Sequence, residues 1–209
     1  GAGEMGRALP FVDVGGAVVF VSAGNLHTCA VLRGGAVKCW GVGQDGQLGL
    51  GAAENRGSGP GEMGRRLPAV DLGAGAVAVE VAAGGFHSCA RLQSGAVKCW
   101  GHSDQGQLGL GNKDKRGDQP GSMGDALPAV NLGDGRKATA PSTLYDHSCA
   151  LFEDGTVKCW GWNKDGQLGL GDRRNRGDAP STMGDALPVV NLGSQAKGAE
   201  LGVGWDHTC

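Results

Sequence analysis

The sequence predicts an all-β protein built from a repeated unit. Glycine makes up 42 of the 209 residues, and each interior glycine costs a helix roughly 1 kcal/mol relative to alanine. No stretch of ten residues has apolar side chains at the helical period of 3.6 residues, whereas short valine-rich stretches bounded by glycine and proline are typical of strands. Four cysteines recur in steps of 60 residues: Cys29, Cys89, Cys149 and Cys209.

The step of 60 residues also relates tryptophans, glutamines and methionines along the chain. It divides the sequence into units of approximately 7–66, 67–126, 127–186 and a partial 187–209, about 3.5 repeats in all. Because each unit resembles its neighbours, we expect them to stack as one domain that spans residues 1–209.

The second unit shows the predicted elements in order. Residues 67–72 are apolar with one acid, and residues 76–82 are rich in valine. Residues 87–92 and 96–100 form two further strand-like stretches, separated by a turn that contains Gly95. Four short strands in each unit, with a period of 40–60 residues, are typical of a β-propeller blade rather than of a solenoid coil.

The cysteines occur in pairs ten residues apart, on either side of the predicted turn. If Cys29 faces Cys39 across an antiparallel hairpin, the same register places Val31 opposite Val37. Directly opposed residues are close enough for a disulfide with slight pinching, and each bond would contribute about 2.5–3 kcal/mol in the chain-entropy model. The predicted disulfides are Cys29–Cys39, Cys89–Cys99 and Cys149–Cys159. The remaining cysteine, Cys209, is the first member of a fourth pair.

Two other interpretations of the cysteines remain open. A reduced pair can pack as two small hydrophobic residues. His27 with Cys29 and Cys39 offers three possible zinc ligands, but no fourth ligand recurs in every unit, so we expect no metal. The repeated histidines are expected to be buried structural residues at the start of a strand: His27, His87, His147 and His207.

Residues 27–51, H-T-C-A-V-L-R-G-G-A-V-K-C-W-G-V-G-Q-D-G-Q-L-G-L-G, resemble the repeat of the regulator-of-chromosome-condensation (RCC1) family. The resemblance recurs at residues 87–111 and 147–171 and covers essentially the whole chain. It implies a seven-bladed propeller, of which this chain would be about half, because seven such units need about 420 residues. The long repeat with two cysteines is similar to bacterial and algal members.

Composition and motifs exclude several classes of function. A formal net charge of −2 gives no field that would attract nucleic acid or an anionic membrane. The sequence contains no run of 18 apolar residues, so no membrane-spanning segment is predicted. No nucleophile, acid and base recur together, so we expect no catalytic residues and no cofactor. The sequence therefore favours a non-catalytic module for protein interaction or a structural scaffold.

The resemblance leaves two alternatives to this function. One is guanine-nucleotide exchange, or other regulatory binding, on a small GTPase. The other is an accessory propeller of a larger enzyme. Since persistent disulfides imply an oxidising compartment, we expect the protein to be extracytoplasmic or secreted.

A polar arm of about 15 residues follows each G-Q-L-G-L-G segment, at residues 52–66, 112–126 and 172–186. Loops on a repeated scaffold are where binding usually occurs, which makes Arg116, Arg173 and Arg176 candidate contacts to a protein or glycan partner. The charges of the arms nearly cancel, so the alternative is a solvated face braced by its own salt bridges.

The third unit departs from the repeat near its second predicted strand. Pro141, Leu144 and Tyr145 stand where the second unit has Val81, Gly84 and Gly85, and Tyr145 is the only tyrosine of the chain. Tyrosine is enriched at the energetic centres of interfaces, so Tyr145 is a second, independent candidate for a partner contact.

Overall fold

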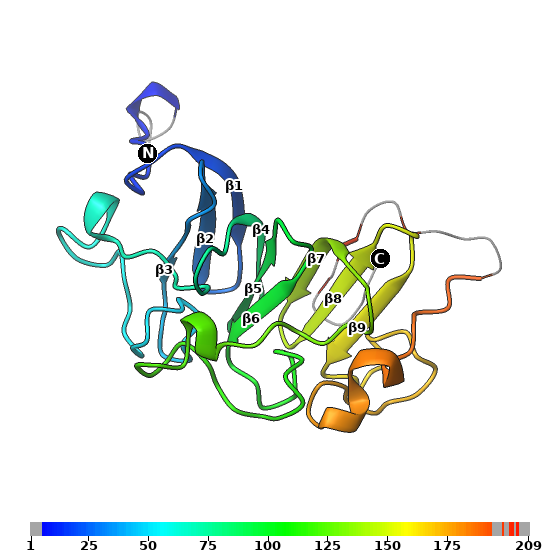
Figure 1. The fold of residues 1–209 in the computed structure, drawn as a ribbon. Coiled ribbons are helices and arrows are strands. Elements are labelled where there is room, and N and C mark those ends of the chain that lie inside the picture. The colour runs from blue at the N-terminus through cyan, green and yellow to red at the C-terminus, as the bar shows by residue number, and fades with distance from the viewer. Residues whose placement is uncertain (1–5, 194–197, 199–200, 203, 205–209) are drawn as a thin grey trace.

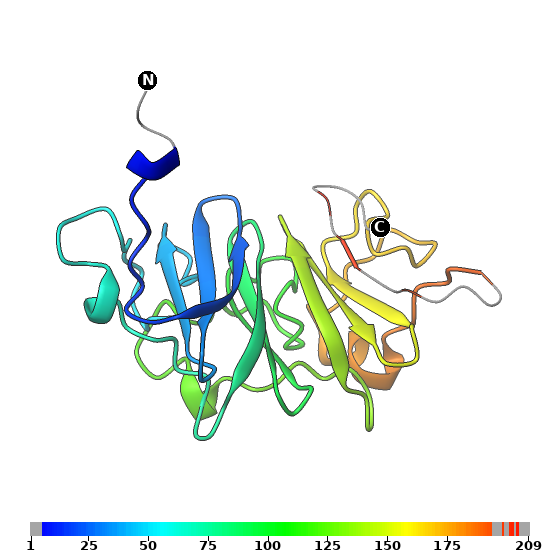
Figure 2. The ribbon, with the colours of Figure 1, turned by 90° about the horizontal axis from the view of Figure 1, so that it is seen from above.

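The computed structural model describes residues 6–193, 198, 201–202 and 204. Within this part of the chain, three antiparallel sheets of three strands each follow one another as the blades of an incomplete propeller, and no α-helix is present. Figures 1 and 2 show the blue, green and yellow sheets side by side in chain order. The all-β propeller predicted from the sequence is confirmed.

Each blade takes its strands in sequence order from one unit. The strands are β1 (Val18–Ala23), β2 (His27–Leu32), β3 (Val37–Gly41), β4 (Ala78–Ala83), β5 (His87–Leu92), β6 (Val97–Gly101), β7 (Ala138–Leu144), β8 (His147–Phe152) and β9 (Val157–Gly161). Five single-turn 3-10 helices are η1 (Gly6–Ala8), η2 (Gly64–Arg66), η3 (Gly124–Ala126), η4 (Pro180–Thr182) and η5 (Gly184–Ala186).

The hairpin register is the one that the cysteine spacing predicts. Cys29 lies opposite Cys39 and Val31 opposite Val37 in β2 and β3, and the same pairing recurs in the other two blades. The sulfur atoms of each pair lie at bonding distance, 2.08 Å in the first two blades and 2.10 Å in the third. All six of these cysteines are fully buried, whereas Cys209 lies outside the described residues.

The predicted first strand of each unit differs from the expectation. Residues 67–72 run beside β3 of the preceding blade but contribute a single ladder bond there, from the Val70 N–H to the Val37 carbonyl at 2.8 Å. Pro68 has no N–H to donate, so an alternating ladder cannot form at this edge. The segment therefore fills the place of a fourth strand without regular pairing, and it ties consecutive blades together.

Neighbouring blades cover each other's faces. β4 lies against β1 and β2, and β7 lies against β4 and β5. Trp100 and Trp160 are fully buried between blades, whereas Trp40 of the first blade is half-buried. Val21 in β1 is 59% exposed, whereas its counterpart Val81 in β4 is only 1% exposed. The preceding blade therefore provides most of the burial of this strand face.

A buried relay of polar groups joins the first two blades. The Ser88 hydroxyl donates to the Gln47 carbonyl at 2.9 Å, and the indole N–H of Trp100 donates to the same oxygen at 3.0 Å. Because the hydroxyl proton is used in this way, the Ser88 oxygen accepts from Nε2 of His27 at 2.8 Å. The relay recurs between the second and third blades through four residues: His87, Ser148, Gln107 and Trp160.

The relay explains two repeated features of the sequence. The side chain of Gln47 accepts the Asp45 N–H at 2.9 Å and so closes the turn that presents its carbonyl. Gly49 has a φ of +68°, and a Cβ there would lie 2.8 Å from the indole nitrogen of Trp100. The G-Q-L-G segment thus needs glycine for close approach to the next blade and glutamine to hold the turn.

We predict that all three cysteine pairs are oxidised in the native protein, because the two cysteines of each pair are buried and lie directly opposite each other in the hairpin. Intact mass should rise by about two hydrogens per bond on reduction, and alkylation before reduction should leave these six cysteines unmodified. Complete alkylation of the unreduced, denatured protein would show that the pairs are free thiols.

Burial lowers the pKa of the two relay histidines. Desolvation lowers the pKa of His27 to about 4. It also lowers that of His87 to about 3, with a smaller contribution from nearby histidines. Both rings are therefore neutral in the folded protein at neutral pH, as a buried structural histidine requires, whereas in the unfolded chain they protonate near pH 6.5. His207 lies outside the described residues.

The free energy of unfolding should consequently fall as the pH drops from about 6.5 towards 4. In that window the unfolded chain binds protons that the folded protein excludes, which costs at most about 1.4 kcal/mol per pH unit for each histidine. Urea denaturation at pH 7, 6 and 5 measures this slope. His87→Gln retains a hydrogen-bond donor for Ser148 and should make the free energy of unfolding depend less steeply on pH. An equal slope in the two proteins would show that His87 does not contribute to the pH dependence.

Candidate functional site

One end of the three blades is formed by two sets of connections. The loops that follow β1, β4 and β7 lie against the turns that follow β3, β6 and β9, and we call this surface the loop face. One backbone hydrogen bond of 2.9 Å joins each loop to its turn: Val42 N–H to Leu26, His102 N–H to Phe86, and Trp162 N–H to Asp146. The loop and turn residues differ between units, whereas the cysteine-bearing hairpins beneath them, β2–β3, β5–β6 and β8–β9, repeat.

Four ring side chains form a continuous cluster on the loop face. The ring of Phe86 lies 6.4 Å from that of His102 and 6.3 Å from that of Tyr145, and Tyr145 lies 6.3 Å from Trp162. The ring planes are inclined at 48–67° to one another. All four side chains are half-buried, so they present ring surface to solvent at the junction of the second and third blades.

Tyr145 adopts a backbone conformation that is unusual for its residue type. Its φ is +46°, and among the described residues no other non-glycine has a positive φ. The equivalent positions hold Asn25 and Gly85. A bulky residue in the left-handed region costs of order 1 kcal/mol or more and persists where the surroundings require it. The structure thus places this sequence-predicted candidate at the centre of the ring cluster.

Charged groups surround the cluster on the side of the second blade. His102 has Nδ1 at 3.4 Å from Asp45 and Nε2 at 3.4 Å from Asp104. The ammonium of Lys115 reaches across from its arm to form an ion pair with Asp45, and this carboxylate raises the pKa of Lys115. Asp104 is exposed, so its charge faces solvent beside the rings.

Asp146 adds a third carboxylate beside Tyr145. It accepts a hydrogen bond from Nε2 of Gln107 at 2.8 Å, but burial raises its pKa, and the charges of Asp104 and Asp45 add to this shift. In the preceding unit Phe86 stands where Asp146 would be. The corresponding nitrogen of Gln47 is consequently buried with no hydrogen-bond partner.

The arms are anchored to the blades by their arginine backbones. Arg116 pairs with Gly101 through two backbone hydrogen bonds, and Arg176 pairs with Gly161 in the same way. The guanidinium of Arg176 bonds to Asp172 at 2.7 Å, and its side chain is only 13% exposed. Arg176 therefore braces its own arm, which is what the alternative interpretation of the arms expects.

The other two arginine candidates lie in more open surroundings. Arg116 donates to the Lys115 carbonyl at 3.3 Å and lines an open cavity of about 650 Å³ on the second arm, together with Lys113, Asp114 and Asp118. Arg173 is exposed. None of the three arginines belongs to the ring cluster around Tyr145. The cavity that Arg116 lines nevertheless adjoins the cluster, because Asp104 lines it as well.

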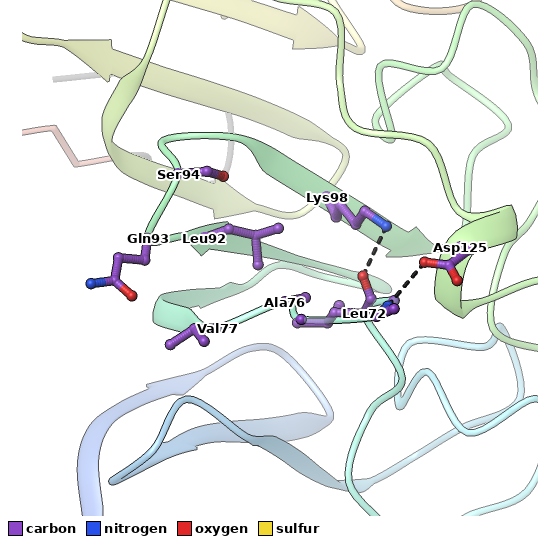
Figure 3. A pocket seen from close by; sticks show the side chains of 11 residues that line it. Leu72, Ala76, Val77, Leu92, Gln93, Ser94, Lys98 and Asp125 are labelled. Carbon is purple, nitrogen blue, oxygen red and sulfur yellow. Dashed lines mark hydrogen bonds between the residues drawn. The ribbon is translucent and has the colours of Figure 1, made fainter.

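A further open cavity of about 500 Å³ lies on the second blade beside η3 (Figure 3). Lys98 donates to the carbonyls of Leu72 and Gly124 at 2.8 and 3.0 Å, and Asp125 accepts the Ala74 N–H at 2.9 Å. The lysine bonds recur in the other units, at Lys38 and Lys158. A contact that recurs in every unit is part of the framework, so this cavity is not the candidate site.

Among the residues that the structure describes, no group of three or more histidine, cysteine or acidic side chains could hold a metal ion. The helices in the same part of the chain are too short to cross a bilayer.

The cluster of Phe86, His102 and Trp162 was not predicted from the sequence. The signal that could have revealed it is the variability of the positions just before each repeated histidine and just after each W-G.

Comparison with protein families gives two matching models, both described as the regulator of chromosome condensation (RCC1) repeat. One matches residues 18–47, 78–107 and 145–167, and the other matches residues 35–91. Together they cover more than half of the chain.

Among curated proteins, the ultraviolet-B receptor UVR8 of Arabidopsis thaliana is 28% identical over 91% of this chain and 50% of the receptor. The human probable E3 ubiquitin-protein ligase HERC3 is 32% identical over 85% of this chain and 16% of the ligase. The chain thus spans half of the first relative and about a sixth of the second.

Two solved structures share the fold. Prp20p of Saccharomyces cerevisiae superposes with a TM-score of 0.67 at 20% identity, over 91% of this chain and 42% of Prp20p. Human WBSCR16 gives a TM-score of 0.64 at 20% identity, over 88% of this chain and 43% of that protein.

Proposed function

Because the chain belongs to the RCC1 repeat family, we propose that it is a non-catalytic propeller module that binds a protein partner through its loop face. The observation that carries this proposal is the ring cluster around Tyr145, which joins two blades and is built from residues that do not repeat. Residues that break a repeat and stay half-exposed are not needed for the repeated packing.

The packing of the blades supports this choice of surface. The sheet faces of the second and third blades are buried, so a partner can reach these two blades only at their rims. Tyrosine and tryptophan dominate the energetics of protein interfaces because they bury a large area and keep a polar tip. The loop face offers both, whereas Arg176 on the arm rim is already engaged with Asp172.

The arms form a second, subsidiary part of the proposed interface. Arg116 and Arg173 are the arm residues that a partner would contact, since Arg116 lines an open cavity and Arg173 is exposed. Prp20p has been described together with its binding to Gsp1p and histones, which shows that a propeller of this fold can serve protein binding.

We also propose that the module works in an oxidising compartment, outside the cytoplasm. Its support is the presence of three buried cysteine pairs at bonding distance, one in every described blade. Disulfides persist in secreted and periplasmic proteins and are rare in the cytosol, where thiols are kept reduced.

Site-specific photo-crosslinking tests the proposed interface. A photoreactive phenylalanine analogue is placed at Tyr145, at Arg173, or at the control position Glu153. Glu153 is exposed in the β8–β9 turn, at the opposite end of the hairpin from the loop face. Irradiation in the native host should give discrete protein adducts at position 145, weaker adducts at 173 and none at 153. Equal adducts at all three positions, or none at 145, would contradict the proposal.

A further inference from the structure

The rings of the loop face offer electron-rich surface to a ligand. Aromatic rings carry negative charge on their faces, and a cation within about 6 Å of a ring centre is attracted to it. Phe86, Tyr145 and Trp162 follow one another at 6.3 Å and are tilted by 62° and 48°. In a tilted pair the edge of one ring meets the face of its neighbour. Because all three side chains are only half-buried, part of the ring surface remains available to a ligand.

The charges beside the rings are predominantly acidic. Asp45, Asp104 and Asp146 contribute three carboxylates. Lys115 forms an ion pair with Asp45 and is also close enough to attract Asp104. His102 lies between Asp45 and Asp104, and Gln107 contributes a neutral amide. Asp104 also lines the cavity of the second arm, whose other charged side chains are those of Lys113, Asp114, Lys115, Arg116 and Asp118. Acidic groups therefore outnumber basic ones by five to three around the cluster. Burial is the main cause of the raised pKa of Asp146, and the nearby carboxylates of Asp104 and Asp45 add to it.

Two features of the cluster lower the stability of the fold, which indicates that these residues serve a function. Tyr145 occupies the left-handed region, where glycine or asparagine is more favourable. Phe86 leaves the amide nitrogen of Gln47 buried without a partner, although an aspartate at the same place in the next unit satisfies Gln107. Sites that break local rules in this way are commonly functional.

We infer that the rings of Phe86, Tyr145 and Trp162, together with the carboxylates of Asp104 and Asp146, form a binding site for a lysine or arginine side chain on an extended basic segment of a partner protein. The inference rests on the proposed function and names the chemistry of the partner. The positive group lies against the ring faces, and its remaining hydrogens point to the carboxylates. Charge complementarity favours this occupant over a nucleic acid or an anionic surface, which the three carboxylates repel.

Calorimetric titration of the whole chain in 0.15 M salt tests the inference. The probes are capped hexalysine and hexa-arginine peptides, with hexaglutamate as the charge-reversed control and chitohexaose as a neutral oligosaccharide. The basic peptides should bind and the other two should not. Binding of chitohexaose without the basic peptides would identify a glycan site, and absence of binding by the basic peptides would overturn the inference.

Ring variants distinguish a specific site from general attraction between opposite charges. Trp162→Ala removes no charge, yet it should weaken binding of the basic peptides about two- to fivefold, the range expected for one exposed cation–ring contact. Trp162→Phe should restore most of the affinity. Tyr145→Asn should lower affinity to a similar degree without unfolding, because asparagine tolerates the left-handed backbone; thermal unfolding verifies the fold of each variant.

A matched pair of charge variants completes the test. Asp146→Asn should weaken binding of the basic peptides more than Glu153→Gln, which removes the same charge from the opposite end of the hairpin. Equal losses in these two variants, or unchanged binding in the ring variants, would show that the peptides respond only to net charge. Adducts at position 145 in the native host, without binding of basic peptides, would retain the proposed function and reject the cationic partner.

Discussion

One buried carbonyl oxygen at each of the two junctions between the described blades holds consecutive blades together. The carbonyl of Gln47 accepts from the hydroxyl of Ser88 and the indole of Trp100, both in the next blade, and Gln107 repeats the arrangement. A buried carbonyl left without donors costs about 1–3 kcal/mol, so the blades are fixed in one relative position. This explains why histidine, serine or threonine, glutamine and tryptophan recur together although they lie far apart within a unit.

Because these contacts fix the positions of the blades, the side chains of the loop face can differ from unit to unit. The backbone there is set by one hydrogen bond between each loop and turn, so the side chains can change without disturbing the blades. Phe86, His102, Tyr145 and Trp162 use this freedom to build a cluster that no single unit contains. The function proposed for the molecule is therefore a property of the junction between two blades.

Much of the frame could be predicted from the sequence, because the repeat fixes it in every unit. The cysteine spacing determined the hairpin register, which the structure reproduces. The sequence predicted a regular fourth strand in each unit from its apolar pattern. The structure has no regular pairing there, because Pro68 lacks the N–H that a ladder would need. The ring cluster could not be predicted, because it depends on the angle between neighbouring blades. Nor could the bracing of Arg176 by Asp172, which depends on how the arm folds back on itself.

A double-mutant cycle on Ser148 and Trp160 tests the central role of the shared carbonyl most directly. Ser148→Ala and Trp160→Phe each remove one of the two donors to Gln107, so after either single change the carbonyl keeps a partner. The double variant leaves it buried and unpaired, and its loss of unfolding free energy should exceed the sum of the single losses by about 1 kcal/mol or more. Additive losses, within about 0.5 kcal/mol, would show that the carbonyl does not hold the blades together.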